Sequence, residues 1–302
     1  MKPALAVVIG AAVLFAFNGV VSKMVLAAGF DPLRLTELRS TATFLVILII
    51  SIIHRSFHIQ RSLLPLIAAY GISEFFVVPG AYFTAIHSLP LGVALLIEYL
   101  APVFVALWSA LKHRARGRIG PWAGLGLSVV GLALVGQVWT KFKLDPVGIG
   151  FAFLAAVALA IAFVIGEKIS PQQSPLSTML WASCAGAVAV GTVKPWWLFH
   201  IGILSSEARG FPIWLLCIDI ISLGTVIPYM LLIEGLRRLS ATRVGVLMTL
   251  EPATGVCLAW VLLGEHLAPV QVLGTLVILG GIVMAEVMGG PSEPDDDSGD
   301  SG

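Results

Sequence analysis

Charged residues are scarce in this chain. They make up 12% of its 302 residues, whereas a soluble globular domain carries about 25%. Hydrophobic residues make up 58%, and the mean hydropathy is +0.98. A net charge of +1 gives no basic surface for a nucleic-acid partner. This composition indicates an integral membrane protein whose partner is the lipid bilayer.

The signatures of several enzyme and channel classes are also missing. Cys184, Cys217 and Cys257 lie in apolar segments without CxxC spacing, so we expect buried hydrophobic side chains there and not a metal or redox site. There is no Walker A motif for ATP and no HExxH motif for zinc, and no TVGYG filter of a potassium channel. We therefore expect no metal, no cofactor and no enzymatic activity.

Long apolar runs are what the chain has in abundance. A spanning helix needs about 20 apolar residues, and ten stretches qualify. They lie at 4–28, 33–53, 64–86, 91–111, 119–138, 147–167, 176–196, 212–236, 242–263 and 269–287. Most begin with a proline near the first turn, where the missing N–H costs nothing. The sequence predicts an all-α membrane protein with ten transmembrane helices and a disordered acidic tail at 289–302.

The short loops indicate the orientation. With the N-terminus inside, eleven Lys and Arg residues fall on the inner side and five on the outer side. Positively charged loops stay in the cytoplasm. We expect a multi-pass protein of the inner (plasma) membrane with both termini cytoplasmic.

An internal repeat divides the ten spans into two sets of five. Segments 88–135 and 238–285 align without a gap at an offset of 150, which places Pro102 on Pro252 and Gly131 on Gly281. Because five is an odd number, the second copy must enter the membrane from the opposite side. The sequence predicts two inverted five-helix repeats, at 1–143 and 144–288, a plan common in secondary transporters.

Four prolines lie inside predicted spans, away from the helix starts: Pro79, Pro102, Pro228 and Pro252. A proline inside a helix removes a hydrogen bond and clashes with the carbonyl four residues back. In lipid, the freed carbonyl must find another partner or line a polar cavity. Breaks at matching places in two halves point to a transport site, so we predict that these prolines break the helices and serve gating.

Two carboxylates fall near the predicted membrane midplane, at about 1.5 Å of rise per residue. Glu98 lies in the fourth span and Glu251 in the ninth. Such residues normally face protein or water. Either they bind a cationic group or a proton, or they are neutral and tied to a backbone carbonyl. Tyr82 and Tyr99 lie three residues from a mid-span proline, where we expect them to line a cavity.

Other polar residues have less definite roles. Asn18, in the middle of the first span, binds either a neighbouring helix or substrate. Lys23, Glu37 and Arg39 form either an outer vestibule or an ion-pair cluster, and the cluster is favoured. Glu74 is expected nearer the cytoplasmic end of its span, in contact with solvent.

Several short motifs resemble a known family. The chain resembles the drug/metabolite transporter superfamily, EamA type, and most closely its exporters of aromatic and other amino acids, of the YddG type. The motifs are Pro32-Leu33 to Leu38-Arg39, Leu89-Pro90-Leu91-Gly92-Val93-Ala94 leading to Pro102, and Glu251-Pro252 leading to Gly264-Glu265. The resemblance implies a central cavity between spans 1, 3, 4, 6, 8 and 9, with spans 5 and 10 at the periphery. It implies these substrate-binding residues: Asn18, Tyr82, Glu98, Tyr99, Phe163, Tyr229 and Glu251.

These observations favour a secondary transporter. We expect it to export small amphipathic metabolites, amino acids including aromatic ones, by alternating access, either with protons as the coupling ion or by facilitated diffusion. The alternatives are an exporter of cationic drugs, an exchanger of sugars, nucleotides or phosphates, and, from another class, a membrane-embedded transferase. A structural or receptor role would leave the paired prolines and acids unexplained.

Overall fold

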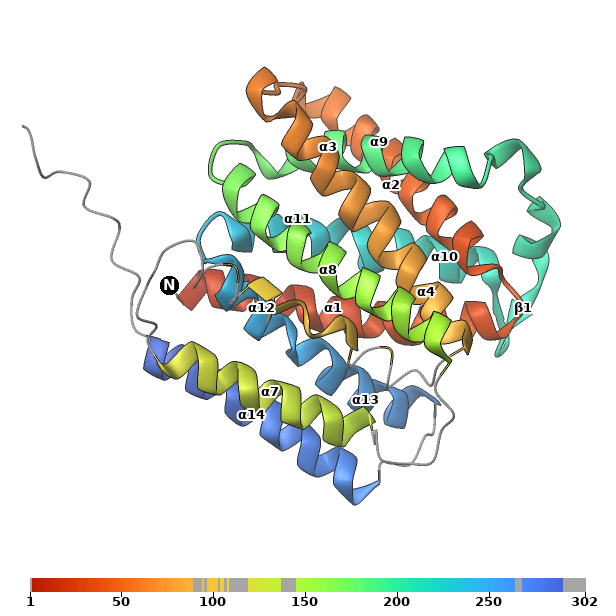
Figure 1. The fold of residues 1–302 in the computed structure, drawn as a ribbon. Helices are drawn as coiled ribbons and strands as arrows, with labels where there is room; N and C mark the ends of the chain where they lie inside the picture. The colour runs from red at the N-terminus through yellow and green to blue at the C-terminus, as the bar shows by residue number, and fades with distance from the viewer. Residues whose placement is uncertain are drawn as a thin grey trace, which may run out of the picture.

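The structure, a computed structural model, describes residues 2–88, 94, 97–102, 104–105, 108, 119–136, 145–263 and 268–289. Most of the predicted span 91–111 lies outside the described residues, as does the tail from residue 290. The described chain is nearly all helical (Figure 1). Six of its helices are long and apolar enough to cross a membrane, and two shorter apolar helices lie at Trp122–Leu134 and Val272–Gly281.

The first half begins with two uninterrupted helices. These are α1 (Lys2–Ala27) and α2 (Pro32–His54). Asp31 caps α2 by accepting a hydrogen bond from the Arg34 backbone N–H at 2.8 Å, and proline occupies the first helical turn, as is common at helix starts. The third span is built from consecutive pieces: η1 (Arg61–Leu63), α3 (Leu64–Ile72), η2 (Ser73–Val77) and α4 (Val78–Ser88). Helix α7 (Ile119–Gly136) ends this half.

The second half follows the same order. Its elements are α8 (Pro146–Ile169), α9 (Pro175–Val193), α10 (Ile213–Ile221), η5 (Ser222–Val226), α11 (Ile227–Leu236), α12 (Ala241–Met248), α13 (Leu250–Leu263) and α14 (Pro269–Gly289). Asp145, Ser174 and Ser240 cap the starts of α8, α9 and α12 through their side chains. Each end is thereby fixed by side-chain acceptors for otherwise unpaired N–H groups.

A short connecting segment joins α9 to α10, and its strands depart from the expected all-α fold. It holds the 3₁₀ turns η3 (Trp196–Leu198) and η4 (Ile201–Ser205) and a hairpin of β1 (Glu207–Ala208) and β2 (Phe211–Pro212). The hairpin turn consists of Arg209 and Gly210, which both have positive φ, 52° and 81°. Two such residues suit the tight turn of a two-residue hairpin.

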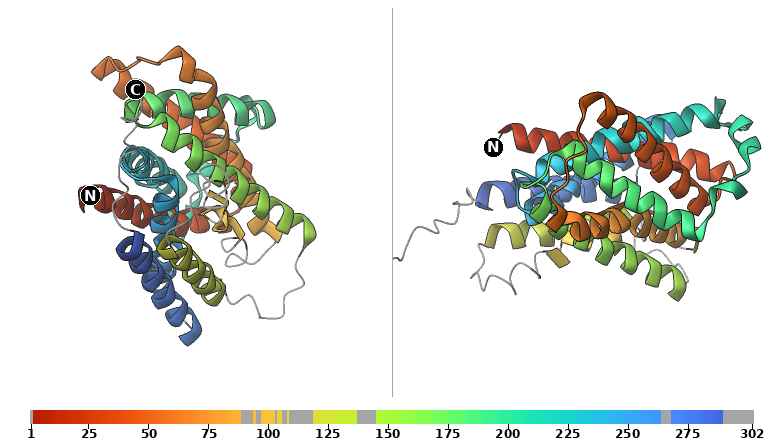
Figure 2. Two further views of the ribbon diagram at one scale, coloured as in Figure 1. Left: turned by 60° about the vertical axis from the view of Figure 1, so that its left-hand side comes forward. Right: turned by 90° about the horizontal axis from the view of Figure 1, so that it is seen from above.

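The two halves are packed into each other (Figures 1 and 2). Helix α1 packs against α11 and α13 of the second half, while α8 packs against α3 and α4 of the first. Helix α2 lies against α9. Helices α7 and α14 pack side by side at one edge, with the most extensive packing of any pair of described elements. The main apolar core therefore lies between the halves and not within either one.

Small residues allow this close packing. A Cβ on Gly71 would overlap the backbone of Ala182 in α9, and a Cβ on Gly186 would overlap Phe75. Such contacts between small residues hold helices together in lipid, where apolar burial alone offers little. They hold the third span tightly against α9.

Candidate functional site

Two of the mid-span prolines each follow a widened helical turn. The π-helical segments η2 (Ser73–Val77) and η5 (Ser222–Val226) each end two residues before a proline, Pro79 and Pro228 respectively. Proline has no N–H for the carbonyl four residues back, and π turns occur frequently at functional sites. The two spans are broken in the same manner, 149 residues apart.

Pro79 leaves the carbonyl of Glu74 without a backbone donor. The Val78 N–H bonds to the Ser73 carbonyl, so the next donor in this register would be residue 79, which is proline. The hydroxyl of Tyr229 in α11 donates a hydrogen bond to the Glu74 carbonyl at 3.3 Å. In lipid a freed carbonyl requires such a partner. A side chain of the second half thus compensates a break in the first.

A second freed carbonyl belongs to Phe75, four residues before Pro79. The hydroxyl of Ser40 in α2 donates a hydrogen bond to it at 2.6 Å. The Phe75 ring packs on Tyr229 with centroids 4.7 Å apart, and Phe15 of α1 meets the same tyrosine edge-on at 4.9 Å. Side chains of α1, α2 and α11 therefore converge on this break.

The break at Pro228 is contacted by Asn18. Gly224 lies four residues before Pro228, and Asn18 of α1, 7% exposed, lies so close that a Cβ on Gly224 would overlap its amide. The Asn18 Oδ1 accepts a hydrogen bond from the Ser22 hydroxyl at 3.3 Å. The structure therefore places this amide between α1 and η5.

The spans that hold Pro102 and Pro252 are also interrupted. A turn begins at Tyr99, and Thr249 forms a turn between α12 and α13, three residues before Pro252. A Cβ on Gly245 of α12 would lie 3.1 Å from the ring of Pro102. The interrupted parts of these two spans thus lie against each other.

Four charged side chains, from four different parts of the chain, lie beside the helix breaks in the interior. Arg39 of α2 is 6% exposed, Glu74 of η2 is 2% exposed and Glu98 is 8% exposed. Glu251 of α13 is partly buried and accepts a hydrogen bond from the Tyr99 hydroxyl. We call these four residues the buried charge cluster.

All four tyrosines of the chain lie on the segments that contain the helix breaks. They are Tyr70, Tyr82, Tyr99 and Tyr229. The hydroxyl of Tyr229 donates to the Glu74 carbonyl, and the hydroxyl of Tyr99 donates to Glu251. A phenol combines an apolar ring with a hydrogen-bonding tip. The arrangement offers aromatic faces, hydroxyl groups and charges of both signs in one place.

Four of the seven residues expected to bind substrate meet at the cluster: Glu98, Tyr99, Tyr229 and Glu251. The other three lie around it. Phe163 of α8, 3% exposed, belongs to the same apolar core as Tyr229. Tyr82 is partly buried, packs on Phe83 with centroids 5.6 Å apart, and adjoins Glu98 and Glu251. Asn18 lies at the η5 break.

Two members of the cluster were assigned elsewhere by the sequence. Glu74 was expected in contact with solvent, which is wrong, because the span starts at Arg61 and buries Glu74 well inside it. Arg39 was grouped with outer charges, but it lies seven residues into α2, about 10 Å below its start at 1.5 Å per residue. Depth along the helix was the signal that could have identified both.

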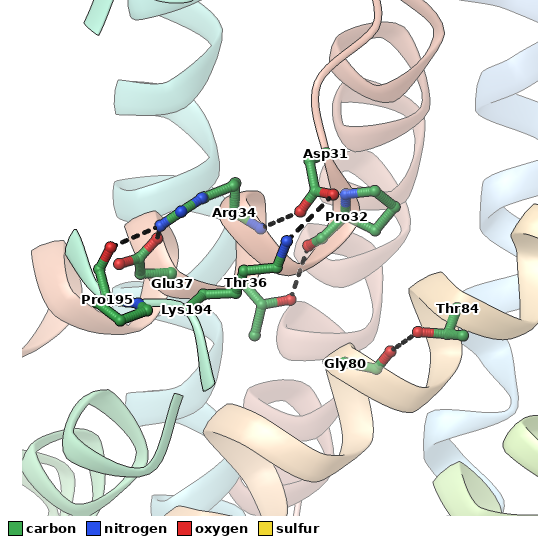
Figure 3. A network of polar contacts seen from close by, with 9 residues as sticks. All are labelled: Asp31, Pro32, Arg34, Thr36, Glu37, Gly80, Thr84, Lys194 and Pro195. Carbon is green, nitrogen blue, oxygen red and sulfur yellow. Dashed lines mark hydrogen bonds and ion pairs between the residues drawn. The ribbon is translucent and has the colours of Figure 1, made fainter. Parts of the chain in front are cut away.

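The outer charges form a separate network at the start of α2 (Figure 3). Arg34 pairs with Glu37 at 2.8 Å and donates to the Pro195 carbonyl at 2.9 Å, while Lys194 pairs with Asp31 at 3.7 Å. Glu37 thus forms an ion pair with Arg34, a residue that the sequence had not grouped with it. This network ties the start of α2 to the end of α9 and does not include Arg39.

The chain is similar to a family of transporters and to individual transport proteins. The profile of the EamA-like transporter family matches residues 2–137 and 146–286. An uncharacterized transporter from Archaeoglobus fulgidus is 27% identical over 88% of this chain and 91% of its own length. The threonine/homoserine exporter RhtA of Escherichia coli K12 is 26% identical over 68% of this chain and 64% of its own length.

A solved structure has the same fold. The crystal structure of a protein 19% identical in sequence superposes on this chain with a TM-score of 0.77. The superposition covers 95% of this chain and 98% of that protein's chain. The family match covers both halves, and the helices have the length and apolarity of a multi-pass membrane protein. This chain therefore belongs to the EamA-like transporter family and is a transporter, not an enzyme.

Proposed function

We propose that the protein exports small amphipathic metabolites, amino acids including aromatic ones, by alternating access across the inner membrane, with both termini in the cytoplasm. The observation that carries this proposal is the buried charge cluster: one guanidinium and three carboxyls at the helix breaks of both halves, with Tyr99 bonded to Glu251 and Tyr229 bonded to the Glu74 carbonyl. Ionisable residues inside a membrane protein mark substrate or ion pathways. The protein would bind its substrate there.

The proposed architecture is ten spans in two inverted repeats, 1–143 and 144–288. Reciprocal contacts between α7 and α14 support it. A Cβ on Gly131 would lie 2.8 Å from the Gly274 carbonyl, and a Cβ on Gly281 would lie 2.7 Å from the Gly124 carbonyl. Gly131 and Gly281 differ by 150 residues, and so do Gly124 and Gly274, so the two contacts join corresponding residues of the two repeats. The same two contacts mean that α7 and α14 are antiparallel. A two-fold axis in the membrane plane produces such a pair.

The paired breaks support alternating access. Pro79 and Pro228 each follow a π segment, and Pro102 and Pro252 each follow a turn. Broken helices let the two parts of one span tilt separately, and transporter sites are typically built from such spans. The breaks surround the cluster, so tilting in either half would expose it to one side of the membrane.

The substrate class is drawn from the relatives and from the chemistry of the cluster. RhtA of Escherichia coli is named as an exporter of threonine and homoserine. Carboxylates suit an ammonium group, and the partly apolar rings of Tyr82, Tyr99, Phe163 and Tyr229 suit aromatic or aliphatic side chains. Specificity for aromatic amino acids of the YddG type is the finer part of the proposal.

The test is substrate exchange by purified protein in liposomes. Vesicles loaded with unlabelled L-threonine or L-phenylalanine should accumulate the labelled amino acid, with and without a pH gradient. Protein-free vesicles and vesicles with the Glu98→Gln variant are the comparisons. Failure of the wild type to exchange any amino acid under either condition would remove the proposed substrate class.

A second candidate is export of cationic compounds coupled to protons. It is favoured by the excess of three carboxyls over one guanidinium in the cluster, because unbalanced buried carboxylates attract a cation or a proton. The same vesicles loaded with choline or tetraphenylphosphonium distinguish the two functions. Exchange of these cations without exchange of amino acids would favour the second candidate.

A further inference from the structure

Arg39 lies at the break in the third span. Its neighbour Ser40 donates the hydrogen bond to the carbonyl of Phe75, and Glu74 precedes that residue. Arg39 is 6% exposed and Glu74 is 2% exposed. Residues 39–40 of α2 and 74–75 of η2 therefore form one buried junction between two spans.

Charged atoms at this junction lack partners. Among the described residues, Arg39 Nε and Glu74 Oε2 are buried without a hydrogen bond. No ion pair within 4.0 Å joins Arg39 to Glu74, Glu98 or Glu251 in the described part of the chain. A buried charge without a partner is costly. Groups of this kind are retained where something else completes them.

The missing partner is defined by the chemistry of the two groups. A guanidinium binds a carboxylate through parallel hydrogen bonds in a planar fork. A carboxylate binds an ammonium group equally well. An α-amino acid carries both groups on one carbon atom, and as a zwitterion it adds no net charge to the cluster.

We propose that Arg39 binds the carboxylate of a zwitterionic amino acid and that Glu74 binds its ammonium group. Arg39 is then the residue that separates amino acids from simple amines. The remaining carboxyls, Glu98 and Glu251, are left for the coupling ion or for the polar side chain of the substrate. This inference rests on the proposed export of amino acids and adds the residue that selects them.

The test compares L-threonine with L-threoninol, in which a CH₂OH group replaces the carboxylate. Each compound competes for exchange of labelled L-threonine by the protein in liposomes. Wild type should prefer threonine by at least about tenfold, the value of one lost charged hydrogen bond. Arg39→Gln should reduce this preference to about one, and Arg39→Lys should give an intermediate value because the charge remains without the fork.

Arg34→Gln is the matched control, since Arg34 is a cation on the same helix, α2, but is already paired in the network at the start of that helix. It should keep the wild-type preference. If Arg39→Gln does not fold, two other measurements test the role of Arg39. They are the preference of Arg39→Lys for threonine over threoninol and the Tm of wild type, which should rise with threonine but not with threoninol. An unchanged preference in the Arg39 variants, or equal Tm shifts with both compounds, would overturn the role of Arg39.

The outcome separates the two proposals. A wild type that exchanges neither L-threonine nor L-phenylalanine contradicts amino acid export itself. A wild type that exchanges them with a preference independent of Arg39 contradicts only the carboxylate site. Loss of preference in Arg39→Gln with retained preference in Arg34→Gln supports both.

Discussion

Single hydroxyl groups hold the broken third span together. Ser40 and Tyr229 donate to the carbonyls of Phe75 and Glu74, at the break where the π segment and Pro79 together disrupt the helical hydrogen bonds. Neither carbonyl has water available in the lipid, so each hydroxyl carries a bond that the backbone cannot replace. The break is therefore supported from α2 on one side and from α11 on the other.

Replacing Ser40 by alanine tests this support. We expect Ser40→Ala to lower the free energy of unfolding by about 1 kcal/mol, because the Phe75 carbonyl loses its donor. Titration of the protein with denaturant in detergent measures the change in the free energy of unfolding. Ser183→Ala is the control, since Ser183 is also buried but its hydroxyl bonds to the Leu180 carbonyl of its own helix at 3.2 Å. Equal losses in both variants would contradict the assigned role of Ser40.

Glu98 gives the second prediction at this scale. We expect Glu98→Gln to reduce substrate exchange by about tenfold or more and to flatten its response to pH, because the amide neither holds a full charge nor takes up a proton. Rates in liposomes between pH 5.5 and 8.5 measure both effects. Glu234→Gln should behave as wild type, since Glu234 lies 23% exposed and pairs with Arg237 and Arg238. Normal exchange by Glu98→Gln would assign Glu98 a structural role.

The sequence located some site residues well and others poorly. Glu98, Tyr99 and Glu251 stood out as polar groups inside apolar runs beside prolines, and the structure brings them together. Arg39 and Glu74 were misassigned because both were expected nearer the ends of their helices than they lie. Ser40 could not be found, because its partner carbonyl depends on how two spans pack.

At the scale of helices, the prolines were visible in the sequence but the form of the breaks was not. Pro79 and Pro228 do not bend a continuous α-helix; each follows a five-residue π segment. A register shift of this kind depends on donors from other spans, such as Tyr229. Local propensity carries no information about those donors.

Substituting these prolines tests the breaks. We expect Pro79→Ala to restore an N–H to residue 79 and favour a continuous helix, so stability should stay the same or rise while exchange falls about tenfold. Thermal unfolding and exchange in liposomes measure the two effects. Pro175→Ala is the control, because Pro175 occupies the first turn of α9, where a backbone N–H would have no helical partner. Full exchange by Pro79→Ala would show that the break is dispensable.

The α7–α14 contact gives a prediction about packing. A Cβ on Gly131 would lie 2.6 Å from Ile278 Cγ1 and 2.8 Å from the Gly274 carbonyl. We expect Gly131→Ala to destabilise the protein by about 1–3 kcal/mol, because backbone must move. Gly126→Ala on the same helix meets nothing within 4 Å and should be neutral or slightly stabilising. Denaturant unfolding compares them, and equal stability of the two variants would contradict the packing.

The whole molecule depends on how its halves interlock. Each half contributes broken spans, and the buried charge cluster takes Arg39, Glu74 and Glu98 from the first half and Glu251 from the second. The length and apolarity of the helices were readable from the sequence, since they follow from composition. The pairing of α1 with α11 and of α8 with α4 was not readable, because it depends on the shapes of small residues in contact.

The central claim is that substrate passes the buried charge cluster. The most direct test measures the accessibility of a single thiol, introduced as Tyr82→Cys in a protein whose three native cysteines are replaced. The control is Ala155→Cys, since Ala155 lies in the core of α8. We predict that a membrane-impermeant thiol reagent modifies Tyr82→Cys from one side of the membrane at a time and that L-threonine or L-phenylalanine slows the reaction, while Ala155→Cys stays unmodified. A Tyr82→Cys protein that exchanges substrate yet reacts from neither side, or reacts at a rate that substrate does not change, would contradict the claim.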